Sequence, residues 1–443
     1  MTDKEIGRLL QAIEDMGEMD NTLIFFIAGD NGTSAEGVMN GLYNEMTYFN
    51  NEPKGSDVDF MLNYYDEWGS PSTYPHMAAG WAVAFDSPFT WTKQVASNYG
   101  GTRQGMIIHW PDGIKAKGEQ REQWHHVIDV VPTILEATGL PHPRVVNRIP
   151  QKPIEGTSMV YTFDNANAAD RHTIQYFEMF GNRGLYFDGW FAGTIHTAPW
   201  AAPAHPLSED VWELYKVDED FSMSKDLAKE HPDKPVELQD LWLAEALKYN
   251  VLPMDDRRQE LFDPKVAGRP DIMFGRKTVT LYEGMGGLLE NDFINTKSTS
   301  FDIVADIETK ESKTNGVILQ QGGRFGGWSF YVKDSKLIYA YNYLGLKIYS
   351  ATSDSKLPKG KSTVKMDFAY DDKTKMGGSG TATIYINDKK VGSVKVDKTE
   401  FSIFSADETA NIGLDMESMT VTDYDTESSK FNGKIDKVVI SLK

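Results

Sequence analysis

The stretch Asn21-Thr-Leu-Ile-Phe-Phe-Ile-Ala-Gly-Asp-Asn-Gly32 joins an apolar, β-branched and aromatic run to an acid and an amide. A run of this length, followed by turn residues, predicts a buried central strand of a parallel or mixed sheet. Ligands of open α/β sheets bind at the carboxyl ends of such strands. Asp30 and Asn31 would offer there the hard oxygen donors that Ca²⁺ or Mg²⁺ prefers. The alternative interpretation is a tight turn, because Asn-Gly is a frequent hairpin dipeptide.

Several further motifs follow this strand in order. They are Trp91-Thr-Lys-Gln-Val-Ala-Ser-Asn-Tyr-Gly-Gly-Thr-Arg103, Gly105-Met-Ile-Ile-His-Trp-Pro111, His125-His-Val-Ile-Asp-Val-Val-Pro-Thr-Ile-Leu135, Pro153-Ile-Glu-Gly-Thr-Ser-Met159, Gln175-Tyr-Phe-Glu-Met-Phe-Gly-Asn-Arg183 and Trp212-Glu-Leu-Tyr215. The series resembles the second half of type I sulfatases, specifically the bacterial arylsulfatase branch, over roughly residues 1–255. The resemblance implies an alkaline-phosphatase-like fold that hydrolyses sulfate esters with a divalent metal, usually Ca²⁺.

The same resemblance defines what is absent. Sulfatases carry, upstream of the Asp-Asn-Gly strand, a Cys or Ser in a Cys/Ser-x-Pro-x-Arg motif that is oxidised to formylglycine, the nucleophile. This chain has no cysteine and no Ser-x-Pro-x-Arg. A pair of aspartates that completes the family's metal site should also precede Asp30. We therefore expect a catalytic-domain fragment without formylglycine, in which Asp30 and Asn31 form an incomplete Ca²⁺ site and a missing N-terminal half is a candidate partner.

Three further site residues are expected from the resemblance and from their surroundings. Lys93 matches the family lysine that contacts a sulfate oxygen and assists the leaving group, and is the expected catalytic and substrate-binding residue; the alternative is a solvated surface lysine. Arg103 follows a Gly-Gly-Thr turn and is expected to bind substrate, or else to be a structural ion-pair partner. His196, like His76, lies in a loop that could line the cleft, and we predict that His196 binds substrate.

The other histidine patterns point away from metal hydrolases. His125 and His126 precede an apolar helical run, and we interpret them as packing or capping groups. No His-x-x-x-His or Glu-paired zinc spacing is present, which disfavours a zinc hydrolase. Phosphatases and phosphodiesterases of the same superfold normally place several His and Asp ligands around two metals, whereas Asp-Asn followed by Lys93 is a sulfatase pairing.

Composition is that of a soluble globular protein of two or three units. The 443 residues are 40% hydrophobic and 12% aromatic, which is enough for sizeable cores. The net charge of −20 argues against nucleic-acid and anionic-membrane partners. Zero cysteine excludes disulfides. No signal peptide or spanning stretch is visible, so the localisation of this chain is unknown, while full-length relatives are expected to be periplasmic or secreted.

Two domains are expected. The first, residues 1–260, is the C-terminal portion of a sulfatase catalytic domain, in which residues 160–255 form a small antiparallel subdomain. Within it, the Gly-, Asn-, Tyr- and Pro-rich stretch 32–91 suits an active-site lid or rim. Helices are predicted from Asp3 to a stop at Gly17, over residues 126–138 and over about residues 236–249, and a short strand over residues 106–110.

The second domain, residues 275–443, follows a charged, proline-punctuated stretch. Short alternating runs at 8 to 12 residue spacing predict an all-β sandwich. Its hairpin around Asn387-Asp388 and its closing run Phe431-Asn-Gly-Lys-Ile-Asp-Lys-Val-Val-Ile440 resemble concanavalin-like jelly rolls and laminin-G modules. Structural packing and glycan binding both stay open for this domain.

The sequence therefore predicts an α/β protein with a partial alkaline-phosphatase-like sulfatase fold followed by an all-β jelly-roll sandwich. The predicted function is that of an arylsulfatase-type sulfuric ester hydrolase acting on a small-molecule or glycan sulfate ester, inactive as this chain alone. The alternative is a non-catalytic glycan-binding or structural protein that works through its C-terminal sandwich.

Overall fold

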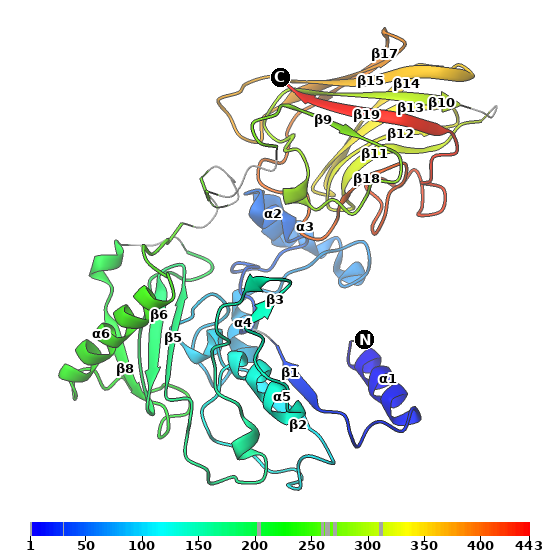
Figure 1. Ribbon diagram of the computed structural model, residues 1–443. Helices are drawn as coiled ribbons and strands as arrows, with labels where there is room; N and C mark the ends of the chain where they lie inside the picture. The colour runs from blue at the N-terminus through cyan, green and yellow to red at the C-terminus, as the bar shows by residue number, and fades with distance from the viewer. Residues whose placement is uncertain are drawn as a thin grey trace. The chain divides into compact units, whose positions relative to one another are not determined.

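The computed structural model describes residues 2–29, 31–201, 205–257, 261, 266–268, 273–309 and 313–443. The chain forms two compact units, one of residues 1–35 and 79–256 and the other of residues 36–78 and 257–443 (Figure 1). Mixed helices and strands make up the first unit and an all-β sandwich dominates the second, which confirms the predicted fold class. None of the helices in these ranges combines the length and apolarity needed to cross a bilayer.

The first unit contains short helices and several small sheets. Its elements are α1 (Thr2–Asp15), β1 (Ile24–Ala28), α4 (Ala79–Asp86), β2 (Gly105–His109), α5 (Val130–Thr138), β3 (Val145–Val146), β4 (Ile149–Pro150), β5 (Ile174–Met179), β6 (Asn182–Phe187), β7 (Trp190–Thr194), β8 (Trp212–Lys216) and α6 (Asp233–Lys248). The helices α1, α5 and α6 and the strand β2 confirm the corresponding predictions to within a few residues. Gly139 ends α5 in the left-handed conformation, with φ at 69°, as the C-terminal stop requires.

The strand β1 forms where we predicted it, but the predicted central, buried position in a parallel or mixed sheet is wrong. In the described chain β1 pairs only with β2, antiparallel, in a two-stranded sheet. Phe26 and Ile27 are each 38% exposed, and Ile107 of β2 is 63% exposed. An apolar run indicates burial only if chain segments cover both faces of the strand. Here the two strands leave apolar side chains uncovered.

The predicted small antiparallel subdomain is confirmed. Strands β5 to β8 form a four-stranded sheet in sequential order, and α6 lies along one of its faces (Figure 1). The core between them contains Leu185, Leu214 and Leu238, all fully buried. Trp242 on α6 packs into the same core and donates its indole N–H to the carbonyl oxygen of Phe177, at 3.0 Å. The described loop segments 180–181, 195–201 and 205–211 connect strands of this sheet.

The second unit contains a segment from early in the chain and a sandwich from its end. Its elements are α2 (Met46–Phe49), α3 (Val58–Leu62), β9 (Thr278–Leu281), β10 (Phe301–Thr309), β11 (Gly316–Gly323), β12 (Gly326–Lys333), β13 (Lys336–Tyr343), β14 (Lys347–Lys356), β15 (Gly360–Tyr370), β16 (Gly380–Ile386), β17 (Lys389–Val396), β18 (Ala410–Ile412) and β19 (Lys434–Leu442).

The sandwich follows from period-two patterning. Its sheets run β17-β16-β15-β10-β19-β9 and β14-β13-β12-β11-β18, with antiparallel pairing throughout. Along β10 every second residue is buried, and the inward side chains meet Trp328, Phe330 and Tyr339 from the facing sheet. The predicted hairpin turn is confirmed, since Asn387 and Asp388 both have positive φ, as a two-residue turn of this kind requires.

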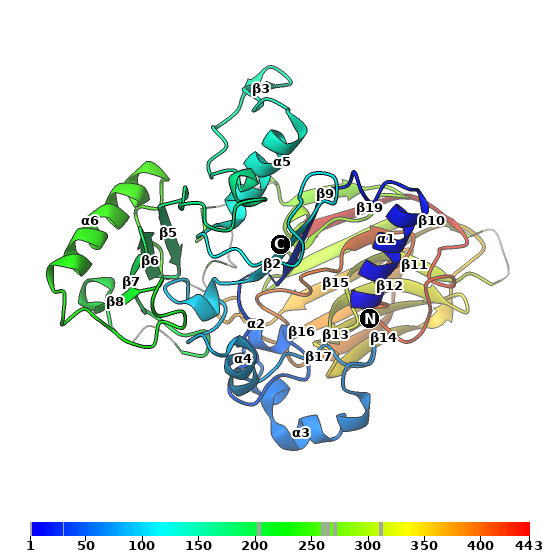
Figure 2. The same cartoon turned by 90° about the horizontal axis from the view of Figure 1, so that it is seen from below.

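Residues 36–78 pack into the sandwich unit, beside its loops (Figure 2). Met46 is fully buried in the main sandwich core. Asn44 is also fully buried and donates to the carbonyl oxygen of Leu344 at 2.8 Å. Tyr74 stacks on Phe325, with ring centroids 5.4 Å apart. This grouping differs from the predicted continuous domain 1–260, because tertiary contacts of single side chains, invisible as a local pattern, tie the segment to strands far along the chain.

We predict that Asn50→Ala destabilises the sandwich although the two are more than 200 residues apart in sequence. The Asn50 amide accepts from the backbone N–H groups of Phe401 and Ser402 and donates to the carbonyl oxygen of Ile403 at 2.8 Å. Leaving such buried groups unpaired costs about 1–3 kcal/mol each, so we expect a loss of about 2–4 kcal/mol. Hydrogen exchange of β12 and β13 measures it. The exposed Asn40, changed to alanine, is the control; equal protection in both variants would contradict the prediction.

Candidate functional site

An open cavity of about 370 Å³ lies at the carboxyl end of β1. The residues lining it are Ala28, Gly29, Gly32, Thr33, Phe85, Asp86, Ser87, Phe89, Arg103 and Gln104. The cavity therefore adjoins Gly29 and Gly32, the two residues that flank the Asp-Asn pair in sequence. Asp30 itself lies outside the described residues, so its part in the site stays a prediction.

The loop after β1 packs directly on the loop that carries Lys93. Gly32 has φ at 82°, and a Cβ added there would lie 1.9 Å from the carbonyl oxygen of Gly100. The backbone N–H of Lys93 donates to the carbonyl oxygen of Thr33 at 3.2 Å. Sixty residues of chain separate these partners, so the fold brings together two motifs that the sulfatase resemblance had linked.

Asn31 carries an oxygen suited to a cation. Its Oδ1 atom is buried and has no hydrogen-bond partner among the residues that the structure describes. A buried amide oxygen left without a partner is costly unless something else satisfies it. The donor set of a carboxylate and an amide oxygen fits a hard divalent cation.

Asp86 fixes the same loop from the cavity side. Its carboxylate accepts hydrogen bonds from the backbone N–H of Thr33, at 3.0 Å and 3.1 Å, and from the Thr33 hydroxyl at 2.7 Å. These three bonds join the C-terminal end of α4 to the loop after β1. They therefore stabilise this wall of the cavity.

Arg103 lies on aromatic rings at the cavity. Its guanidinium carbon is 4.0 Å from the centroid of Phe221, 5.1 Å from that of Tyr99 and 5.4 Å from that of Phe89. Partial burial lowers the pKa of Arg103 from its ordinary value. No ion pair of Arg103 occurs within the described ranges, so the structural ion-pair alternative receives no support. A guanidinium held by rings keeps its N–H donors for an anionic ligand.

Asn182 organises the backbone around Lys93. Its side chain is fully buried at the start of β6. It donates to the carbonyl oxygens of Gln94 and Thr197, both at 2.9 Å, and accepts from the backbone N–H groups of His196 and Thr197. The amide thus clamps the half-buried Lys93 loop to the loop after β7, although neither motif reveals the link in sequence.

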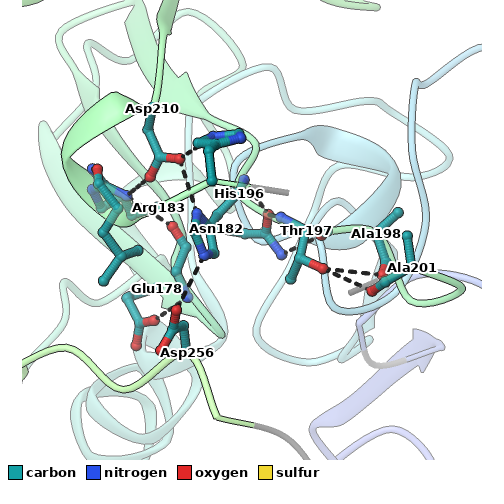
Figure 3. Close-up of polar contacts among 12 residues, drawn as sticks. Glu178, Asn182, Arg183, His196, Thr197, Ala198, Ala201, Asp210 and Asp256 are labelled. Atoms are coloured by element: carbon teal, nitrogen blue, oxygen red, sulfur yellow. Dashed lines mark hydrogen bonds and ion pairs between the residues drawn. The ribbon is translucent and has the colours of Figure 1, made fainter. Parts of the chain in front are cut away.

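His196 lies in a polar cluster and not on the cavity wall. Its side chain is fully buried, with Nδ1 2.9 Å from Asp210 and Nε2 3.3 Å from Asp256, and Arg183 pairs with the second Asp210 oxygen at 2.5 Å (Figure 3). The substrate-binding role of His196 stays a prediction that this position does not support. His76 pairs at 3.7 Å with Glu36 in the sandwich unit.

Sequence reasoning missed the partners of His196. His205 points Nε2 at the same Asp210 oxygen, at 2.8 Å. Asp210 and Asp256 are 14 and 60 residues from His196. No short-range sequence motif predicts this cluster. The sequence showed only that histidines and acidic residues occur after residue 195.

A second buried cluster confirms the capping role of His126. Its side chain accepts from the backbone N–H of Ile128 at the start of a helical turn. The neighbouring Asp129 is fully buried and accepts from His125 at 3.1 Å and His172 at 2.8 Å. Burial by itself raises the pKa of Asp129, but these hydrogen bonds outweigh it and hold the pKa below its ordinary value. Burial lowers the pKa of His126 to about 4.

Comparison with known proteins agrees with the arrangement of motifs. Residues 1–140 match the sulfatase family model. An uncharacterized sulfatase of Schizosaccharomyces pombe is 27% identical over 259 residues, which cover 58% of this chain and 43% of that protein. An arylsulfatase of Klebsiella aerogenes is 25% identical over 158 residues, which cover 35% of this chain and 31% of that protein. The chain thus spans less than half the length of each of these curated relatives.

Solved structures show weaker similarity. The crystal structure of Ps i-CgsB is 16% identical, covering 60% of this chain and 46% of that chain, with a TM-score of 0.37. The CBM40 of the Ruminococcus gnavus IT-sialidase, bound to α2,3-sialyllactose, is 15% identical, covering 38% of this chain and 89% of that chain, with a TM-score of 0.26.

We predict that His126 makes the first unit less stable in mild acid. Burial lowers the pKa of His126 from 6.5 in the unfolded state to about 4 in the folded state. Between these pH values the imidazole is protonated in the unfolded state but neutral in the folded state. The free energy of unfolding should therefore be highest above about pH 6.5 and should fall by up to about 3 kcal/mol as the pH is lowered towards 4.

His126→Asn keeps a capping oxygen and should remove this pH dependence of stability. Hydrogen exchange of α5 at several pH values tests it, with the exposed His142→Asn as control; an unchanged pH profile in His126→Asn would refute the assignment.

Proposed function

From the premise that the N-terminal part of this chain is a sulfatase domain, matched at residues 1–140, we propose that the protein is an arylsulfatase-type sulfuric ester hydrolase whose active site is built at the carboxyl end of β1. The observation that carries the proposal is the contact between two distant motifs. The Asn31-Gly32 loop packs on the Lys93 loop beside the cavity, and the buried Asn31 Oδ1 has no hydrogen-bond partner among the described residues.

The chemistry of sulfate ester cleavage suits these side chains. Breaking the S–O bond requires positive charge on the sulfuryl oxygens and a proton or cation for the departing oxygen. Lys93 provides a compact ammonium that binds a sulfate oxygen and assists the leaving group. The guanidinium of Arg103, which lies over the Phe221 ring, provides a second, planar cation for the sulfate group.

Sulfatases generally use a divalent metal, and we propose Ca²⁺ as the ion here. Asp30 and Asn31 would hold it, as an acid and an amide oxygen suit a hard cation. When bound, the ion supplies further positive charge for the sulfuryl oxygens. Two ligands fall short of the six to eight oxygens that Ca²⁺ takes, so we propose that this chain holds only part of the site.

The nucleophile must come from elsewhere. The 443 residues contain no cysteine and no Ser-x-Pro-x-Arg, so they offer no precursor of formylglycine. We propose that the chain acts together with a polypeptide segment that carries the nucleophile and the remaining metal ligands. The uncovered apolar faces of β1 and β2 support this, because such faces favour association with further strands.

The alternative function is glycan binding or a structural role through the sandwich. The structural role is favoured by one observation, the use of the sandwich loops to hold residues 36–78. Glu52 of that segment accepts from the Tyr343 hydroxyl at 2.7 Å and from Lys398 at 2.6 Å. The expected substrate remains a small-molecule or glycan sulfate ester, and we propose the secreted or periplasmic location typical of sulfatases for the assembled enzyme.

We predict that the chain alone releases no 4-nitrophenol from 4-nitrophenyl sulfate above background. When it is combined with a formylglycine-bearing segment, for example in one longer polypeptide, activity should appear and Lys93→Ala should lower kcat about 10²- to 10⁴-fold, since proton assistance to the leaving group contributes about that much. Lys117→Ala, at an exposed position, is the control. Turnover by the isolated chain, or full activity of the Lys93 variant, would refute the assignment.

A separate prediction concerns calcium. The isolated chain should bind Ca²⁺ more weakly than about 10⁻⁴ M, because Asp30 and Asn31 would supply only two of the six to eight oxygen ligands. Asn31→Ala should remove what binding there is, as titration calorimetry would detect. Micromolar affinity that survives Asn31→Ala would place the ion elsewhere.

A further inference from the structure

Two imidazoles and one carboxylate converge in the loop after β7. In the part of the chain that the structure describes, His196, His205 and Asp210 are the one group of three such side chains whose ligand atoms all lie within 4.8 Å of one another. Nδ1 of His196 and Nε2 of His205 lie 2.9 Å and 2.8 Å from the same Asp210 oxygen. The two rings are nearly perpendicular, at 79°. Both nitrogens can therefore approach one point without a clash between the rings.

We propose that His196, His205 and Asp210 form a binding site for a divalent transition-metal ion, with zinc as the fitting class. Two imidazole nitrogens and one carboxylate oxygen are a usual zinc ligand set, whereas Ca²⁺ and Mg²⁺ prefer oxygen. This site is distinct from the oxygen-donor site proposed at Asn31 and does not depend on the proposed hydrolase function.

Two of the three separations between ligand atoms require only a small adjustment, and the two imidazole nitrogens lie within 4.8 Å of each other. Tetrahedral ligands about 2.0–2.1 Å from zinc lie about 3.3 Å from one another. The observed separations of 2.8 Å and 2.9 Å are a few tenths of an ångström shorter. His205 is one-third exposed at its side chain, so it can move outwards and also opens a path for the ion. The fourth position would face the same opening and take a water molecule.

Residues around the three ligands hold them as metal sites require. Asp256 faces Nε2 of His196 at 3.3 Å, so that an N–H on that nitrogen donates to the carboxylate and leaves Nδ1 free of its proton for the ion. Arg183 fixes the other Asp210 oxygen at 2.5 Å. Figure 3 shows Asp210 and Asp256 on different sides of His196. A carboxylate–histidine–metal arrangement with an oriented carboxylate ligand is thus already assembled.

The site would link two separate parts of the first unit. His196 and His205 lie in the β7–β8 connection and Asp210 at its end, while Asp256 belongs to the segment after α6. Through its backbone N–H, His196 is also bound to Asn182, which holds the Lys93 loop. A bound ion would therefore stiffen the support of the Lys93 loop without touching the cavity.

Zinc titration of the chelator-treated full chain, against a chromogenic competitor, tests the proposal. We expect one ion per chain. His205→Ala should lower the affinity at least about 100-fold, and Asp256→Asn about 10- to 100-fold, the range seen when a group that orients a ligand is lost. Both positions are partly exposed, so the fold should survive. Cobalt substitution gives a spectroscopic measure of nitrogen and oxygen ligation that needs no activity.

Two controls separate this site from other binding. His142→Ala removes an exposed imidazole outside the cluster and should leave zinc affinity unchanged, as should Asn31→Ala at the proposed calcium site. Absence of saturable zinc binding in the unaltered chain would leave the group as a hydrogen-bonded cluster and overturn the proposal. Equal affinity in the unaltered chain, in His205→Ala and in Asp256→Asn would also overturn it.

Discussion

The candidate site depends on the closeness of two backbones at Gly32. No side chain fits there, because an added Cβ would overlap the carbonyl oxygen of Gly100. Gly100 in turn lies against the carbonyl oxygen of Trp91, where a Cβ would come within 2.2 Å. These two glycines allow the loop after β1 to lie directly on the loop that carries Lys93. The cavity lies beside this contact, with Gly32 and Arg103 both in its lining.

Buried polar groups, more than apolar packing, hold the loops around that contact. Trp91 and Gln94 flank the Lys93 segment with φ at 66° and 78°, and residues in such conformations cost about 1–3 kcal/mol each unless their surroundings enforce them. Asn182 supplies part of that enforcement through its bond to Gln94. Because a buried amide without partners is itself costly, the clamp has one favourable arrangement. Loops built in this way can present charged groups in fixed positions.

The sandwich applies the same principle to residues 36–78. Asn44, Asn50 and Glu52 each bind backbone or side-chain groups of the sandwich loops, and Met46 enters its core. These contacts hold the long connection 36–78 to the sandwich at several points along its length. The C-terminal sandwich is therefore more than an appended module, since part of the N-terminal sequence completes its packing.

Patterns of neighbouring residues were enough to predict much of the fold. The helical run from Asp3 to the stop at Gly17 predicted α1, the short alternating runs after residue 275 predicted the sandwich, and Asn387-Asp388 predicted the hairpin turn, because helix, strand and turn preferences act over a few residues. The motifs around Asp30, Asn31 and Lys93 likewise carry the sulfatase resemblance, since each is a run of consecutive residues.

Tertiary structure alone decided what covers each element and which distant side chains meet. The apolar run of β1 predicted burial, yet burial depends on other chain segments, and β1 is half exposed. The sequence showed no zinc spacing, yet folding brings His196, His205, Asp210 and Asp256 together across 60 residues. Periodicity reports the preferences of a local segment, whereas such contacts arise from the path of the whole chain, and no short-range pattern encodes that path.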